Sequence, residues 1–85
     1  MNSSAGRMAD IGARVAIMLD NLSLGKTSDV EAINQATLDM PDENMQTING
    51  TETPDELRRL RDSWLAVSRK FSSQADGPFS VNRMA

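Results

Sequence analysis

The chain has 85 residues, a formal net charge of -3 and no cysteine, histidine or tyrosine. Without Cys and His it lacks a thiolate nucleophile, an imidazole base and the usual ligands of structural zinc, so we expect no enzyme activity, cofactor or metal. No apolar run approaches the ~20 residues of a membrane span, and no apolar segment of a secretory signal follows the N-terminus. The composition therefore predicts a cytoplasmic protein that does not contact the membrane.

Charge is sorted along the chain. Residues 27–56 contain eight acidic residues and no basic one, whereas residues 57–85 contain six basic and two acidic residues. Such runs can pair within the chain, between copies of it or with a partner. The simpler alternative is that both runs are solvated surface.

The first predicted helix spans residues 5–23. Its large apolar residues repeat at spacings of three and four, which is typical of a helix packed along one side: Met8, Ile11, Val15, Met18 and Leu22. Ile17 and Leu19 are expected to widen this apolar stripe. Gly25 stands where a left-handed C-terminal cap is expected. Gly12, with alanines near it, predicts a close approach of another backbone.

A shorter helix is predicted over residues 28–40, before a proline. Ser28 and Glu31 have the spacing of a capping box, in which each side chain accepts from the other residue's amide. Apolar residues are sparse in this helix, so we expect it to depend on the other two for its stability. The acidic segment that follows is predicted to be a loop, with Met45 and Ile48 as its apolar anchors.

The last predicted helix spans residues 54–72. Thr53 suits its N-cap, Pro54 its first position and Glu56 the closing position of a capping box. Its apolar residues again repeat at spacings of three and four: Leu57, Leu60, Trp64, Val67 and Phe71. Residues 73–85 contain a Gly-Pro breaker and are predicted to be a flexible tail, which leaves a single helical domain over residues 1–72.

Together these elements predict an all-α fold, a small helical bundle or hairpin. Two apolar stripes alone make a thin core in a chain of this size, so we expect a protein partner or further copies of the chain on them. The predicted partner interface consists of stripe residues and one arginine: Leu57, Leu60, Arg61, Trp64, Val67, Phe71, Met8, Ile11, Val15 and Met18. Trp64 has two interpretations, as a core residue with a hydrogen-bonded indole or as an interface hot spot.

These features indicate a protein–protein interaction module, such as an inhibitor, adaptor or assembly subunit, that forms oligomers. Small acidic helical chains of this kind are typical of bacterial and phage accessory proteins. The alternative is a regulator that binds a nucleic acid through the basic residues of its last helix. The same residues could contact an acidic partner: Arg58, Arg59, Arg61, Arg69 and Lys70. The acidic middle segment and a pI of about 4.7 favour the protein-binding interpretation.

Overall fold

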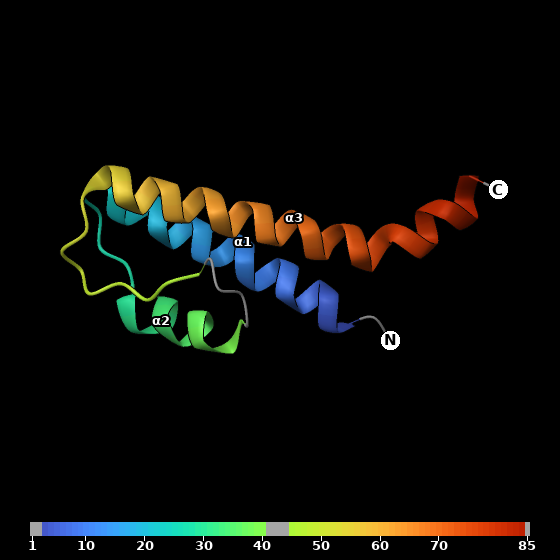
Figure 1. The fold of residues 1–85 in the computed structure, drawn as a ribbon, viewed down its shortest axis with the longest axis horizontal. Coiled ribbons are helices and arrows are strands. Elements are labelled where there is room, and N and C mark those ends of the chain that lie inside the picture. The colour runs from blue at the N-terminus through green and yellow to red at the C-terminus, as the bar shows by residue number, and fades with distance from the viewer. Residues whose placement is uncertain (1–2, 41–44, 85) are drawn as a thin grey trace.

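The computed structural model describes residues 3–40 and 45–84, with side chains described as far as residue 74. Over these residues the chain forms three helices and no strand: α1 (Ser3–Ser23), α2 (Val30–Asp39) and α3 (Pro54–Met84). α1 and α3 run antiparallel as a hairpin, and α2 lies along one side of it (Figure 1). The predicted all-α fold is confirmed. None of the described helices combines the length and the apolar character that crossing a bilayer requires.

The end of α1 has the predicted glycine cap. Gly25 has a φ of 81°, and its N–H donates to the carbonyl of Leu22 at 3.0 Å. The N–H of Lys26 donates to the carbonyl of Asn21 at 2.9 Å. These two bonds form a Schellman motif, which satisfies carbonyls that the last turn leaves without helical partners.

The close approach predicted at Gly12 is also confirmed, and the backbone that approaches belongs to α3. A Cβ atom on Gly12 would lie 3.0 Å from the Cβ of Ser68. The hydroxyl of Ser68 donates to the carbonyl of Ala9 at 2.7 Å, across the same crossing. Because Gly12 has no side chain, α1 and α3 come close enough for the short side chain of Ser68 in α3 to bond a backbone carbonyl of α1.

The capping box predicted at the start of α2 is wrong by one residue. Asp29 is the N-cap, and its carboxylate accepts from the N–H of Ala32 at 3.0 Å. The hydroxyl of Ser28 instead donates to the carbonyl of Met18 in α1 at 3.0 Å. Ser28 is used for this contact between segments, so the adjacent aspartate takes the cap and α2 begins at Val30.

The segment after α2 is held to the body by its two predicted anchors. Met45 and Ile48 are both buried. The side chain of Asn34, in α2, donates to the carbonyl of Ile48 and accepts from its N–H, both at 2.7 Å. These two bonds pair one amide side chain with the peptide groups of an extended segment, so that Ile48 is fixed over the core.

α3 begins with the predicted capping box. The N–H of Thr53 donates to the Glu56 carboxylate at 2.8 Å, and the N–H of Glu56 donates to the Thr53 hydroxyl at 3.1 Å. The helix continues beyond the predicted end at residue 72, through Pro78 to Met84. A proline fits the φ of a helix but removes one hydrogen bond, and the C-terminal part of α3 bends away from the line of the rest (Figure 1). The flexibility of residues 73–85 stays a prediction.

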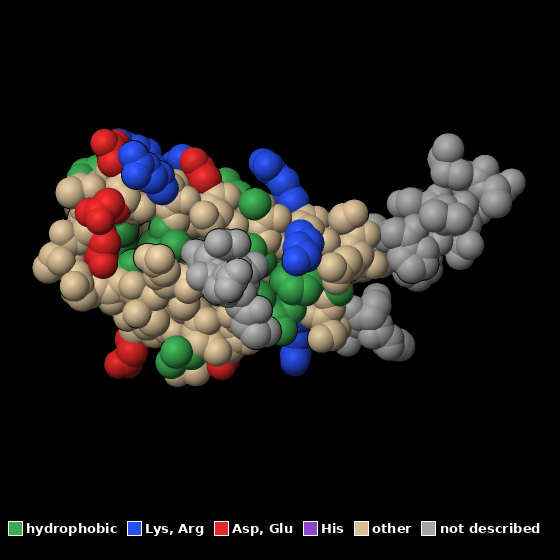
Figure 2. Space-filling model, in the orientation of Figure 1, with side chains coloured by type: hydrophobic (Ala, Val, Ile, Leu, Met, Phe, Trp, Pro, Cys, Tyr) green, Lys and Arg blue, Asp and Glu red, His purple; other side chains and the backbone are tan. Residues whose placement is uncertain are grey.

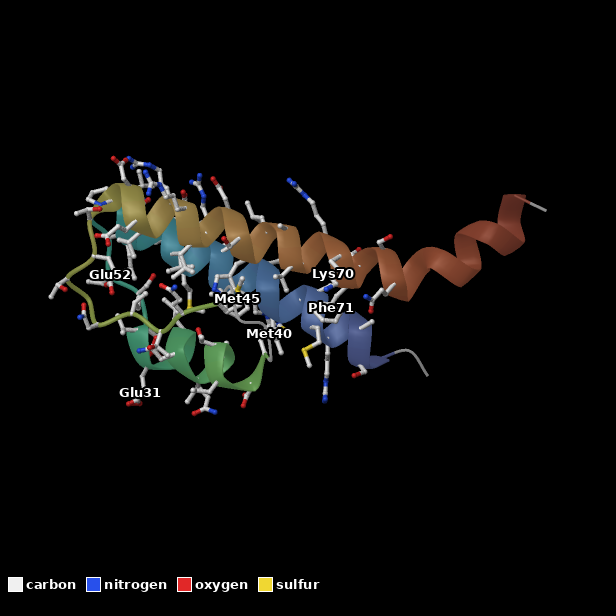
Figure 3. All side chains as sticks on the ribbon, viewed as in Figure 1. Glu31, Met40, Met45, Glu52, Lys70 and Phe71 are labelled. Carbon is white, nitrogen blue, oxygen red and sulfur yellow. The ribbon has the colours of Figure 1, made fainter. Side chains whose placement is uncertain are left out.

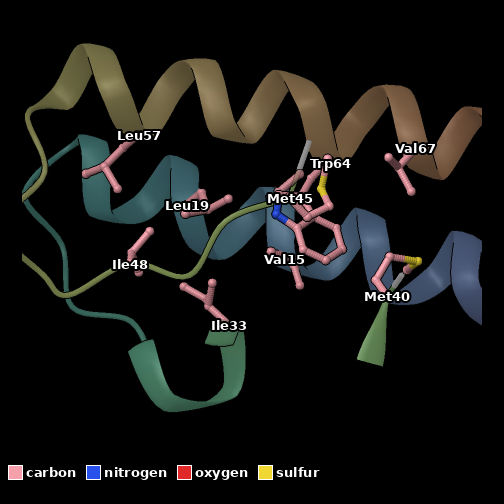
Figure 4. Packing of buried hydrophobic residues seen from close by; sticks show 10 residues of the cluster. Val15, Leu19, Ile33, Met40, Met45, Ile48, Leu57, Trp64 and Val67 are labelled. Atoms are coloured by element: carbon pink, nitrogen blue, oxygen red, sulfur yellow. The ribbon is translucent and has the colours of Figure 1, made fainter. Parts of the chain in front are cut away.

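The core lies where the hairpin, α2 and the segment after α2 meet (Figure 4). Four large side chains are almost completely buried there: Trp64, Leu19, Ile33 and Val15. Trp64 lies beside Met45, and among the residues that the structure describes its Nε1–H has no hydrogen-bond acceptor. Of the two interpretations of Trp64, the structure supports the core residue, without the hydrogen bond that we expected.

Candidate functional site

An open groove lies between α1 and α3 on the side that faces away from the core. It has a volume of about 300 Å³ and is lined by residues of both helices: Ala16, Ile17, Asp20, Arg61 and Leu65. We call it the α1–α3 groove. Ile17 is 62% exposed, although it is only two residues from the buried Val15. Two residues turn a helix by about 200°, so the two side chains point in nearly opposite directions.

Apolar side chains form the floor of the α1–α3 groove and a charged pair closes one end. Ala16 is buried at the floor and Leu65 is half-buried. Asp20 of α1 forms an ion pair with Arg61 of α3, and Arg61 also bonds the Asp62 carboxylate at 3.0 Å. The hydrogen bond to Asp20, followed by that to Asp62, raises the pKa of Arg61 above its usual value. The groove thus offers a partner an apolar surface beside a fixed pair of charges.

The predicted partner-interface residues fall into two groups. Four are buried in the chain's own core: Val15, Leu57, Trp64 and Val67. Five are partly buried and pack against that core: Met8, Ile11, Met18, Leu60 and Phe71. Arg61 alone of the ten lines the α1–α3 groove. The heptad-spaced stripes therefore do their packing largely within one chain, and the interface expected on them stays a prediction.

At the end of the hairpin beyond α2, half-buried apolar side chains pack against the core. Phe71 projects from α3 beside Met40 at this end, next to Lys70 (Figure 3). Hydrophobic side chains show on the surface in the same region (Figure 2). Phe71 and Met8 are both half-buried, so they lie at the edge of the core and contact it on one side.

The five cations of the predicted basic surface do not share one side of α3. Arg58 is paired with Asp55, and Arg61 turns toward α1, whereas the other three are exposed: Arg59, Arg69 and Lys70. Lys70 directly follows Arg69, so their side chains leave the helix about 100° apart. In Figure 2 the basic side chains appear in several separate places, some beside acidic ones. Binding of a nucleic acid stays a prediction.

A second, more polar hollow of about 250 Å³ lies on another side of α3. Its lining is drawn from α3 and the segment before it: Gln46, Glu56, Arg59, Leu60 and Ser63. Thr53 lowers the pKa of Glu56, first through its backbone N–H, which donates to the carboxylate, and then through its side chain. That carboxylate therefore caps the N-terminus of α3 and is a weaker base than an ordinary glutamate.

Sequence reasoning missed the role of Ile17. We expected it to widen the apolar stripe of the first helix, yet it points away from the core and Leu19 is the residue that enters it. The helical positions carry the signal, because Ile17 lies about 200° from Val15 and outside the arc of the stripe. The structure also shows that the half-buried Leu65, on α3, lines the same groove as Ile17, on α1.

Comparisons of the chain with protein-family models, with curated proteins and with solved structures give no match.

Proposed function

We propose that the chain is a non-enzymatic protein-binding module and that the α1–α3 groove is its binding surface. The observation that carries the proposal is the 62% exposure of Ile17 at the edge of a groove with an apolar floor. A large aliphatic side chain gains about 1.5–3 kcal/mol when it is transferred fully from water to an apolar site. A partner that covers the groove would recover much of that free energy.

The shape of the groove supports a protein as the partner. It lies between two antiparallel helices and is lined by about one turn of each, residues 16–20 of α1 and 61–65 of α3. A helix or helical hairpin that lies along it could extend the two-helix layer into a bundle. The Asp20–Arg61 pair at the edge would set the position of such a partner rather than supply most of the affinity. A cytoplasmic location and a role as inhibitor, adaptor or assembly subunit belong to the same proposal.

Photo-crosslinking in the native host tests the proposal. A photoreactive amino acid is placed at position 17, and in a second variant at position 38, where Leu38 is 73% exposed on α2. We expect a discrete covalent adduct of the chain with a protein from position 17 and none from position 38. Equal, diffuse labelling from both positions would show that crosslinking depends only on how exposed the position is, and it would overturn the proposal.

A further inference from the structure

We infer that the chain modifies itself at Asn49, whose side-chain amide is converted to a carboxylate by reaction with the backbone of Gly50. Both residues lie in the exposed turn between the segment after α2 and the start of α3. Hydrogen bonds within a run of four residues close this turn: Asn49, Gly50, Thr51 and Glu52. The α1–α3 groove is lined by other residues, so the turn is a second place in the molecule with chemistry of its own.

The side-chain carbonyl of Asn49 is polarised by two donors from Thr51. Its Oδ1 accepts from the backbone N–H of Thr51 at 2.9 Å and from the Thr51 hydroxyl at 2.6 Å. A backbone N–H can only donate, so the atom that it meets is the oxygen of the amide. When a nucleophile adds to the carbonyl carbon, this oxygen takes on negative charge, and donors already in place stabilise that charge.

The same bonds fold the Asn49 side chain over the peptide group that joins it to Gly50. A bond from the N–H two residues on to an asparagine side chain closes an Asx turn, in which the side chain mimics a backbone turn. The Cγ of Asn49 and the nitrogen of Gly50 both belong to the ring of atoms that this bond closes. Attack of the nitrogen on Cγ therefore starts from a conformation already folded toward the product, a five-membered imide.

Glu52 holds the proton that the attacking nitrogen must lose. One oxygen of its carboxylate accepts from the N–H of Gly50 and the other from the N–H of Asn49, each at 3.0 Å. A general base acts from about 2.6–3.2 Å, and the Glu52 carboxylate lies within that range of the Gly50 nitrogen. Gly50 has a φ of 92°, and a Cβ added to it would meet no atom within 4 Å, so the approach is unobstructed and open to water.

The reaction balances without an oxidant or a reductant. The Gly50 nitrogen forms a bond to Cγ of Asn49 and gives its proton to Glu52, which returns a proton to Nδ2 as the Cγ–Nδ2 bond breaks. Ammonia leaves and a cyclic imide remains. Water then adds to either carbonyl of the imide, which gives aspartate or isoaspartate at position 49. Each converted chain therefore gains a negative charge, and the isoaspartate product also has a longer main chain.

Asn21 and Asn34 have different surroundings and serve as internal references. Asn34 uses both ends of its side-chain amide to bind Ile48, and Gln35 follows it within α2. Asn21 lies in α1, where the next amide belongs to a residue of the helix with a large side chain. Neither is followed by a glycine. Of these three asparagines, we expect only Asn49 to be converted in the folded chain.

Peptide mass spectrometry after incubation at neutral pH measures the conversion at each asparagine. We expect Asn49 to be converted at least as fast in the folded wild type as in the chain unfolded by guanidinium chloride, because unfolding removes the bonds from Thr51 and Glu52. Asn21 and Asn34 should stay unconverted in the folded chain over the same period. Slower conversion of Asn49 in the folded chain would show that the turn protects the amide, and it would overturn the inference.

Substitutions in the turn test its two roles separately. Thr51→Val removes one donor to Oδ1 and Glu52→Gln removes the base, and we expect each to slow conversion in the folded chain by about threefold or more. The matched controls are Thr47→Val and Glu31→Gln, which change exposed side chains outside the turn and should leave the rate as in the wild type. A rate that is unchanged or higher in either turn variant would overturn the inference.

Discussion

Gly12 and Ser68 stand opposite each other where α1 packs against α3, and no side chain separates their backbones. An added Cβ on Gly12 would lie 3.0 Å from the Cβ and 3.2 Å from the Cα of Ser68. The second of these atoms is backbone, so the clash cannot be relieved by a side-chain rotation. The hairpin that forms the α1–α3 groove depends on this close approach.

Gly12→Ala should therefore destabilise the protein, although alanine is the better helix former by about 1 kcal/mol. Overpacking of a closely packed contact costs about 1–3 kcal/mol, so after the gain in helix propensity we expect the free energy of unfolding to fall by up to about 2 kcal/mol. Gly6→Ala is the matched control on the same helix, because nothing lies within 4 Å of its added Cβ. Chemical denaturation measures both, and a Gly12→Ala variant more stable than the wild type would contradict the packing.

The hydroxyl of Ser68 should contribute to stability through its bond to the carbonyl of Ala9. We expect Ser68→Ala to lower the free energy of unfolding by about 1 kcal/mol, the usual net contribution of one hydrogen bond. Ser63→Ala is the control, since its hydroxyl bonds a carbonyl of its own helix at 3.2 Å on the surface. If thermal unfolding shows the same small change for both variants, the bond between the helices is not stabilising.

The two hydrogen bonds between Asn34 and Ile48 should hold the segment after α2 on the core. Asn34→Ala removes the hydrogen-bond partners of both the N–H and the carbonyl of Ile48, and we expect a loss of about 1–3 kcal/mol in stability. The Ile48 amide should also exchange with deuterium faster in this variant. Gln35→Ala removes only an exposed side-chain bond to Asp39 and should change neither quantity. Unaltered exchange at Ile48 in Asn34→Ala would contradict the clamp.

The cap of α3 predicts how stability depends on pH. The Thr53 donors hold the pKa of Glu56 below its ordinary value of 4.5 in the folded chain. The unfolded state therefore takes up its proton first, and the contribution of Glu56 is present above pH 4.5 and is lost as the pH falls through the folded pKa. The difference in melting temperature between the wild type and Glu56→Gln should shrink over that range. A difference that stays constant down to pH 3 would contradict this role.

Much of the fold could be predicted because its signals are local. The 3-4 spacing around Val15 and Trp64, the Thr53–Glu56 capping box and the glycine cap at Gly25 each depend on residues within a few positions. The N-cap of α2 was misplaced because Ser28 and Asp29 are both good capping residues. The choice between them depends on Met18, in another helix, whose carbonyl accepts from Ser28.

The candidate site was predicted less well, because it depends on how two helices meet. The groove joins Ile17 to Leu65, which are far apart in the sequence, and no local pattern pairs them. Arg61 was predicted as an interface residue, but its pairing with Asp20 follows from the register of the hairpin. The end of α3 was misplaced because a Gly-Pro pair ends most helices, whereas here the helix continues with a bend.

The central claim is that the α1–α3 groove is where this chain binds a protein partner. Photo-crosslinking from position 17, with position 38 as the matched control, tests it most directly, since Ile17 and Leu38 are both exposed apolar residues. We predict a discrete adduct with a protein from position 17 and none from position 38. Equal labelling from both positions would contradict the claim.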